Sequence, residues 1–95
     1  MKYTIYQPKE VSFRVDSDKK NYSKKSYNQM YEGELHEDLT NGDFLERIFY
    51  IFNMTKPHDF HGHSLSVGDI VVLHEDDYKR AYICDIFGWN KITLR

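Results

Sequence analysis

The 95-residue chain has little cysteine, no long apolar run and no excess of positive charge. Its one cysteine, Cys84, cannot form an internal disulfide, so packing must hold the fold together, as in a cytoplasmic protein. No apolar stretch approaches the roughly 18 residues that a membrane-spanning helix needs, and the N-terminus lacks the apolar segment of a signal peptide. The formal net charge of −2 argues against a generally basic nucleic-acid-binding protein. We therefore expect a single small domain, residues 1–95, in the cytoplasm.

The charge that is present is unevenly distributed. Residues 1–27 contain seven Lys or Arg and three Asp or Glu, a net charge of +4. Residues 28–95 contain six and twelve, a net charge of −6. Polar and charged residues dominate 9–26, which predicts a loosely structured basic loop or arm. Within it, Phe13 and Val15 are expected to reach the core.

Hydrophobic periodicity predicts one main helix over 43–53. Thr40 or Asn41 can cap its N-terminus, and Asn53 and Pro57 end it. The helix is too apolar to stand exposed and should lie across a sheet. Its apolar side chains follow the i, i+3, i+4, i+7 spacing of one helical face: Leu45, Ile48, Phe49 and Phe52.

Alternating and apolar segments predict the strands of that sheet. A strand over 2–7 precedes a second over 27–35, in which Tyr27, Tyr31 and Leu35 share one face. The C-terminal third predicts an antiparallel meander of three strands. The fold class is therefore α+β, with one main helix packed on a small, twisted, mostly antiparallel sheet. The predicted meander strands are 69–74, 79–86 and 91–94, joined by turns at 75–78 and 87–90.

Four separated segments of the chain resemble YodL-like domains. They lie in the family's order and span about residues 27–92. The resemblance implies a cytosolic accessory protein of Gram-positive bacteria, their phages or mobile elements, and a domain that also occurs in large polyvalent proteins beside antirestriction domains. It supplies no catalytic residue. The segments are Tyr31–Leu35 (YEGEL), Phe52-Asn53 before Pro57–Phe60 (PHDF), His61–Leu73 (HGHSLSVGDIVVL) and Ala81–Trp89 (AYICDIFGW).

The same segments have a structural interpretation. Gly62 permits a tight turn, Leu65 and Val67 can anchor the loop in the core, and Gly88 is expected at positive φ. Asp69 offers side-chain oxygens to loop amides. The residues expected to maintain this motif are Gly62, His63, Ser64, Gly68, Asp69, Gly88 and Trp89.

Clusters that could support catalysis or metal binding lack the required spacing. His58, His61 and His63 lie close together, and Cys84 could join them, but no CxxC or HExxH pattern is present. A triad including Ser64 lacks the GxSxG elbow. We expect no enzymatic activity, no cofactor and no bound metal, with a metal-dependent enzyme as the remaining alternative.

Two charged surfaces remain as candidates for binding. The acidic surface either keeps the protein in solution or docks on a basic partner. Together with the mobile-element setting that the resemblance implies, docking suggests a non-enzymatic protein-binding module of a phage or mobile element. Such a module would be an anti-defence inhibitor that occupies a basic surface of a host CRISPR or restriction nuclease, or a regulator of another host protein. The acidic candidates are Glu32, Glu34, Glu37, Asp38, Glu75, Asp76 and Asp77, with Tyr31 beside them.

The alternative is a nucleic-acid-binding accessory protein. Lysines neutralise phosphates and tyrosines stack on bases, and no other segment is basic enough to widen the basic patch. The residues of this patch are Lys19, Lys20, Tyr22, Lys24 and Lys25.

Overall fold

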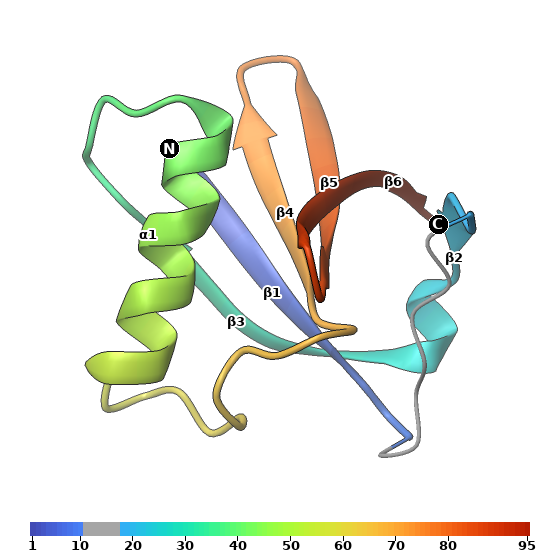
Figure 1. The fold of residues 1–95 in the computed structure, drawn as a ribbon. Coiled ribbons are helices and arrows are strands. Elements are labelled where there is room, and N and C mark those ends of the chain that lie inside the picture. The colour runs from blue at the N-terminus through green and yellow to red at the C-terminus, as the bar shows by residue number, and fades with distance from the viewer. Residues whose placement is uncertain (11–17) are drawn as a thin grey trace.

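The computed structural model describes residues 1–10 and 18–95, and these form one α-helix and a six-stranded sheet (Figure 1). The strands lie in the order β2-β6-β5-β4-β1-β3. The elements are β1 Lys2–Pro8, β2 Asn21–Tyr22, the short 3₁₀-helix η1 Lys24–Ser26, β3 Tyr27–Glu34, α1 Asn41–Met54, β4 Ile70–Glu75, β5 Tyr78–Asp85 and β6 Gly88–Leu94. No helix in the described part of the chain is long and apolar enough to cross a membrane.

The sheet is mostly antiparallel, as predicted, but it is mixed because one pairing at its edge is parallel. The C-terminal meander β4-β5-β6 is antiparallel as predicted, and β1 lies antiparallel between β3 and β4. In contrast, β2 pairs parallel with β6. The Thr93 amide donates to the Lys20 carbonyl at 2.7 Å, and the Arg95 amide donates to the Tyr22 carbonyl at 2.9 Å.

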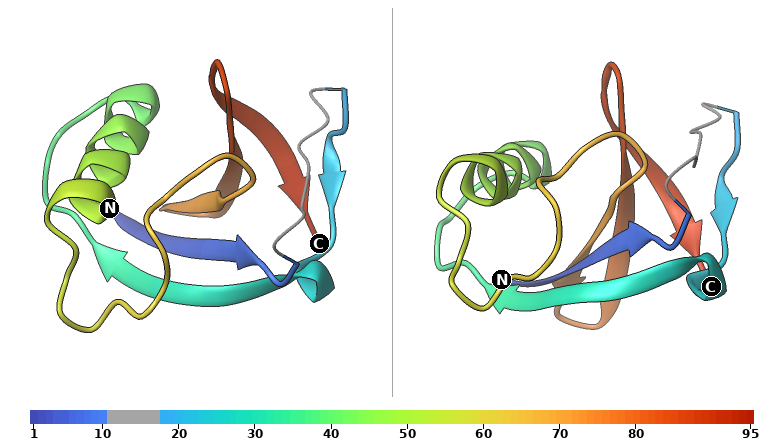
Figure 2. Two further views of the ribbon diagram at one scale, coloured as in Figure 1. Left: turned by 60° about the horizontal axis from the view of Figure 1, so that its bottom comes forward. Right: turned by 90° about the horizontal axis from the view of Figure 1, so that it is seen from below.

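Part of the predicted basic arm forms regular structure, because Asn21–Tyr22 is the edge strand β2 and Lys24–Ser26 is η1. The chain passes from β2 through η1 directly into β3, at the opposite edge of the sheet. This connection requires the sheet to curl, as Figure 2 shows. Phe13 and Val15, which were expected to reach the core, lie outside the described residues.

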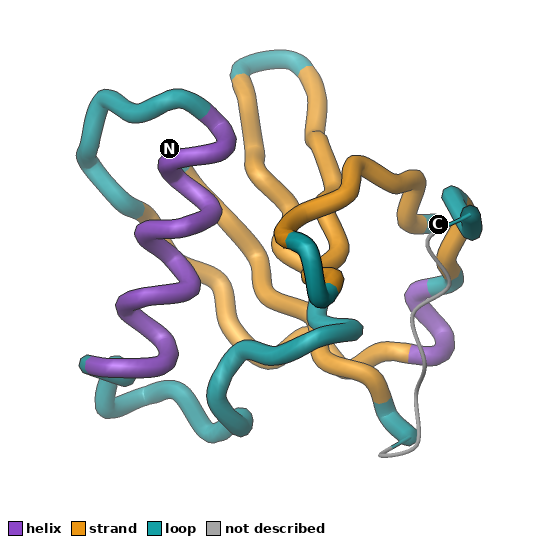
Figure 3. Tube along the Cα trace, in the orientation of Figure 1, coloured by secondary structure: helices purple, strands orange, loops and turns teal. Residues whose placement is uncertain are grey.

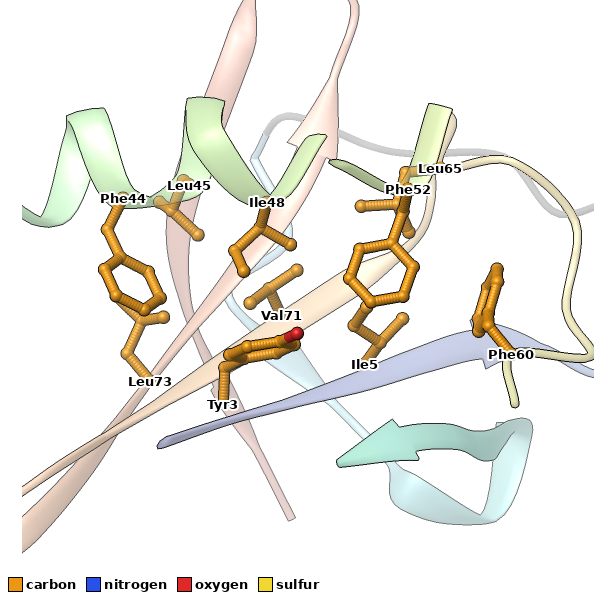
Figure 4. Packing of buried hydrophobic residues seen from close by; sticks show 10 residues of the cluster. All are labelled: Tyr3, Ile5, Phe44, Leu45, Ile48, Phe52, Phe60, Leu65, Val71 and Leu73. Atoms are coloured by element: carbon orange, nitrogen blue, oxygen red, sulfur yellow. The ribbon is translucent and has the colours of Figure 1, made fainter. Parts of the chain in front are cut away.

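The main core lies between α1 and one face of the sheet. Figure 4 shows Phe44, Ile48 and Phe52 of the helix above Tyr3 and Leu73 of the sheet. Each large apolar side chain buried here stabilises the fold by about 1.5–3 kcal/mol. The complete buried cluster is Tyr3, Ile5, Phe44, Leu45, Ile48, Phe52, Phe60, Leu65, Val71 and Leu73.

Local sequence explains where this helix begins and ends. The Thr40 hydroxyl accepts a hydrogen bond from the Asp43 amide at 3.2 Å, which satisfies one of the free N-terminal amides. The Thr55 amide still donates to the Ile51 carbonyl, so the helix extends one residue beyond Asn53, to Met54. The predicted helix is confirmed with slightly wider bounds.

The other face of the sheet carries a second apolar cluster. Ile70 and Val72 of β4 point to this face, while Val71 and Leu73 point toward α1. Because both faces of β4 are buried, its sequence is a continuous apolar run. Tyr22 and Tyr27, from the two edges of the sheet, meet in this second cluster because the sheet curls. It comprises Tyr22, Tyr27, Ile70, Val72, Ala81, Ile83 and Ile92.

Tyr27 and Tyr31 do not share a face, contrary to the sequence expectation. Ile5 pairs with Tyr31, but the next residue of β1, Tyr6, pairs with Gln29, so Met30 is an extra residue in β3. Because side chains alternate between the two faces of a sheet, one extra residue moves the side chains beyond it to the opposite face. Tyr31 consequently packs toward the helix and Tyr27 toward the second cluster.

Candidate functional site

The loop between α1 and β4 is tied to the sheet by a buried polar network. The Gln7 amide nitrogen donates to the His63 carbonyl at 2.8 Å and to Asp69 Oδ2 at 3.1 Å. The same carboxylate oxygen accepts from the Ser66 amide at 3.0 Å. Asp69 is almost completely buried, and this burial raises the pKa of its carboxyl to about 6. The sequence did not single out Gln7, because it is one polar residue in an alternating strand.

Two glycines of this loop have different reasons to be glycine. Gly68 has a φ of 100°, a conformation that side chains rarely adopt. Gly62 lacks a positive φ, but a Cβ there would collide with the Gln7 side chain and approach the Phe60 ring to 2.7 Å. Space, and not the tight turn expected from the sequence, therefore requires Gly62. Val67 was expected to anchor the loop but is 44% exposed, which corrects that prediction.

The histidines of the loop do not converge on a metal or a nucleophile. His58 and His61 are exposed, and His63 Nδ1 donates to the neighbouring Ser64 carbonyl at 2.7 Å. Among residues 1–10 and 18–95, no three His, Cys, Asp or Glu side chains are grouped so that they could hold a metal ion. Cys84 is buried, and its burial raises the pKa of the thiol to about 11, which makes it a poor nucleophile.

The fold brings the predicted acidic residues to one end of the sheet. Glu34, Lys2, His74 and Lys79 form a row across β3, β1, β4 and β5, and the β4–β5 turn lies just beyond it. Figure 1 shows this turn and the loop preceding α1 at the top of the molecule. The acidic candidates lie in or beside these two segments. Glu32 and Glu34 are in the last part of β3, Glu37 and Asp38 in the loop before α1, Glu75 at the end of β4, and Asp76 and Asp77 in the turn.

Basic partners neutralise part of this acidic end. Glu37 accepts from Arg47 at 3.2 Å, and Glu75 lies 2.6 Å from Arg80. In the described part of the chain, no ion pair holds Asp38, Asp76 or Asp77. Tyr31, expected beside the acids as a contact residue, instead packs edge-on against Phe52 and Phe60, with ring centroids 5.2 and 5.9 Å apart.

The predicted nucleic-acid patch loses its aromatic component. Tyr22 is only 4% exposed, and the Lys19 ammonium lies 4.6 Å from the centre of its ring. The ring is therefore not available to stack on a base, which corrects that expectation. Lys20, Lys24 and Lys25 are exposed.

A basic cavity on the sheet face opposite α1 was not anticipated. Its volume is about 330 Å³, and Lys24 lines it together with Lys79, Arg80 and Lys91 of the meander. The sequence expectation that no other segment extends the basic patch is therefore wrong. Lys24 is separated from the other three basic residues by 55 to 67 positions in the sequence. It meets them here because the sheet curls.

The turn between β5 and β6 is shorter than predicted and strongly apolar. Asp85 pairs with Gly88, so only Ile86 and Phe87 form the loop, and Gly88 to Asn90 belong to β6. Figure 3 shows this short loop between the two strands. Gly88 has a φ of 131°, as expected, and permits the sharp return of the chain. Ile86 is 73% exposed and Phe87 92% exposed.

Asp85 fixes the conformation of this apolar turn. One carboxylate oxygen accepts from the Ile86 amide at 2.5 Å, and the other accepts from the Asn90 side chain at 2.8 Å. The carboxylate thus bridges the two strands at the base of the loop. We name Asp85–Gly88 the β5–β6 apex.

A small recess separates the apex from the helix. It has a volume of about 120 Å³, and its charged lining residues are Glu46 and Asp85. Its aromatic residues, Phe49 and Trp89, contact edge to face with centroids 6.4 Å apart. Trp89 thereby packs against the main core from β6.

Comparison with known proteins gives one positive result. No curated protein and no solved structure matches the chain. The model of the YodL-like domain family matches residues 2–94, which includes residues 8–26, where the sequence resemblance offered nothing. Nearly the whole chain is covered, so this protein belongs to the YodL-like domain family.

Proposed function

We propose that this protein is a non-catalytic protein-binding module whose contact surface centres on the β5–β6 apex. The observation that carries the proposal is the combination of an almost fully exposed Phe87 and a backbone fixed by Asp85. Ile86 and Phe87 are adjacent and both largely in water, and contiguous exposed apolar surface is typical of interaction sites.

The physical argument is preorganisation. Burying an exposed phenylalanine against a partner contributes about 1.5–3 kcal/mol, and aromatic residues dominate the energetics of protein interfaces. Because Asp85 already holds the turn in one conformation, binding costs little backbone entropy. Ile86 extends the same apolar surface.

Charge defines the kind of partner that this surface fits. Glu46 and Asp85 lie beside the recess next to the apex, and the sequence-predicted acids lie at the far end of β5. A complementary partner offers an apolar pocket bordered by Lys or Arg. The anti-defence role in a phage or mobile element, against a CRISPR or restriction nuclease, is part of this proposal. It rests on the mobile-element setting that the sequence resemblance implies, whereas the family match supports membership of the YodL-like family alone.

Affinity capture with matched variants tests the proposal. Purified wild type, Phe87→Ser and Met54→Ser are immobilised, exposed to a lysate of a Gram-positive bacterium with restriction and CRISPR systems, and the retained proteins are quantified by mass spectrometry. Met54 is the control because it is also an exposed apolar residue, at 69%, but ends α1. We expect proteins that wild type and Met54→Ser retain and Phe87→Ser loses.

Two results would contradict the proposal. Identical retention by all three proteins would exclude the apex as the contact surface. Loss of retention on charge reversal of Glu32, Glu34, Glu37 and Asp38, with Phe87→Ser unaffected, would instead assign binding to the acidic end of the sheet.

A further inference from the structure

The cavity on the sheet face opposite α1 is enclosed by the curl of the sheet. Residues of β1, β3, β4, β5, β6 and η1 line it, so every described element except β2 and α1 contributes. Its volume of about 330 Å³ lies at the lower end of the range for small-molecule sites. Side chains alternate along a strand, so Thr4, Val72 and His74 lie on this face and not under the helix.

The walls of the cavity are predominantly cationic. Lys24 and Lys79 line it, and in the described part of the chain no ion pair neutralises either of them. Arg80 is committed elsewhere, because its Nε lies 2.6 Å from Glu75. Glu32 is the carboxylate among the lining residues. An anion therefore gains more from entering the cavity than a cation does.

The floor is apolar, whereas several side chains on the walls can form hydrogen bonds. Val72, Ala81 and Ile92 form part of the second apolar cluster and also line the cavity. A ligand that fits both parts has a compact apolar body and a strongly anionic group. The polar lining groups that can orient it include Thr4, Gln29 and His74.

We propose that this cavity binds a small phosphate-bearing molecule of the nucleoside monophosphate class. The phosphate lies between Lys24 and Lys79, since lysine ammonium groups act as point charges toward phosphate. The base or sugar lies over Val72 and Ala81. This site is independent of the β5–β6 apex and requires no partner protein.

His74 provides a reporter within the cavity. Its Nε2 is 2.8 Å from the Thr4 hydroxyl. Burial and the positive charges of Lys79 and Lys2 lower the pKa of this imidazole below its usual value, against the opposing effect of Glu32. A bound phosphate reverses the local field, so the pKa of His74 rises on binding. Lys24, Arg80 and Lys91 are the other charged groups that line the cavity.

Titration of the full chain with adenosine 5′-monophosphate, followed by calorimetry and by the NMR signals of His74, tests the site. We expect saturable binding, weaker binding of inorganic phosphate, and weaker binding still of uncharged adenosine. Lys24→Gln and Lys79→Gln should each weaken binding of the monophosphate about tenfold, the loss of one charge-assisted contact. Lys56→Gln is the matched control, because this exposed lysine follows α1 and does not line the cavity.

Thermal unfolding of each variant shows that the fold is intact, since Lys24 and Lys79 are both exposed. No binding of the monophosphate at millimolar concentration would overturn the proposal, as would binding that Lys24→Gln and Lys79→Gln leave unchanged. Binding of a single-stranded oligonucleotide without binding of the mononucleotide would also overturn it, in favour of nucleic acid as the ligand. An unchanged pKa of His74 in the saturated protein would place the phosphate elsewhere.

Discussion

Asp69 is a buried carboxylate that organises a loop and imposes a pH dependence on stability. Its Oδ2 accepts hydrogen bonds from Gln7 and Ser66, yet burial raises the pKa to about 6, above the value of 3.8 for an exposed aspartate. At a pH between these two pKa values, the carboxyl of Asp69 keeps its proton in the native state, whereas the unfolded chain has already released it. The resulting stabilisation is complete at low pH and is lost as the pH rises through the folded-state pKa.

Asp69→Asn should remove this dependence. The quantity to compare is the unfolding free energy of wild type minus that of the variant at each pH. Contributions from the other titrating groups cancel in this difference. We expect this difference to fall by about 1–3 kcal/mol between about pH 4 and about pH 7, measured by urea unfolding. A difference that stays constant, or rises with pH, would show that the carboxyl does not titrate as a buried group.

Gly62 and Gly42 make a matched pair of substitutions. A Cβ at Gly62 would collide with Gln7 and Phe60, both buried, so Gly62→Ala should destabilise the protein by about 1–3 kcal/mol. A Cβ at Gly42, in the first turn of α1, meets no atom within 4 Å. Gly42→Ala should therefore be neutral or stabilise by up to about 1 kcal/mol. Equal effects of the two substitutions on the urea midpoint would contradict the crowding at Gly62.

For single residues, the sequence predicts what a side chain can bond better than it predicts where the fold places that side chain. Asp69 was correctly expected to hold loop amides, because short acidic side chains do so near turns. Nothing in the sequence marked Gln7, whose importance depends on which strand lies beside the loop. Phe87 belongs to an apolar segment, and burial is the usual expectation for such a residue, so its exposure emerges only from the fold.

At the scale of elements, local patterns predicted what depends on local contacts. The period of α1 and the apolar run of β4 are visible in the sequence because each buries a continuous surface. The bulge at Met30 and the parallel pairing of β2 with β6 depend on contacts with distant strands. For the same reason the cavity opposite α1, which combines side chains from both ends of the chain, could not be predicted.

The N-cap of α1 allows a direct test of the helix start. Thr40→Ala removes the hydroxyl that accepts from the Asp43 amide and should lower the unfolding free energy by about 0.5–2 kcal/mol. Thr40→Ser keeps that oxygen and serves as the control. Urea unfolding of both variants measures the effect, and equal loss in the two would show that the hydroxyl has no capping role.

At the scale of the whole molecule, the two faces of the sheet differ in what covers them. α1 covers one face with the main core, while the curled face holds the second cluster and the basic cavity. The net charge of −2 conceals this arrangement, because lysines around the cavity coexist with carboxylates at the sheet end and near the apex. Our two proposals together assign an anion and a partner protein to separate surfaces of this small domain.

The most direct test of protein binding through the apex is the affinity of the captured partner for wild type and Phe87→Ser, measured by calorimetry at one salt concentration. We predict that Phe87→Ser weakens binding at least about thirtyfold, as expected for a central aromatic contact, while thermal stability stays within about 0.5 kcal/mol of wild type. Met54→Ser should bind like wild type. Equal affinities of wild type and Phe87→Ser would contradict the account.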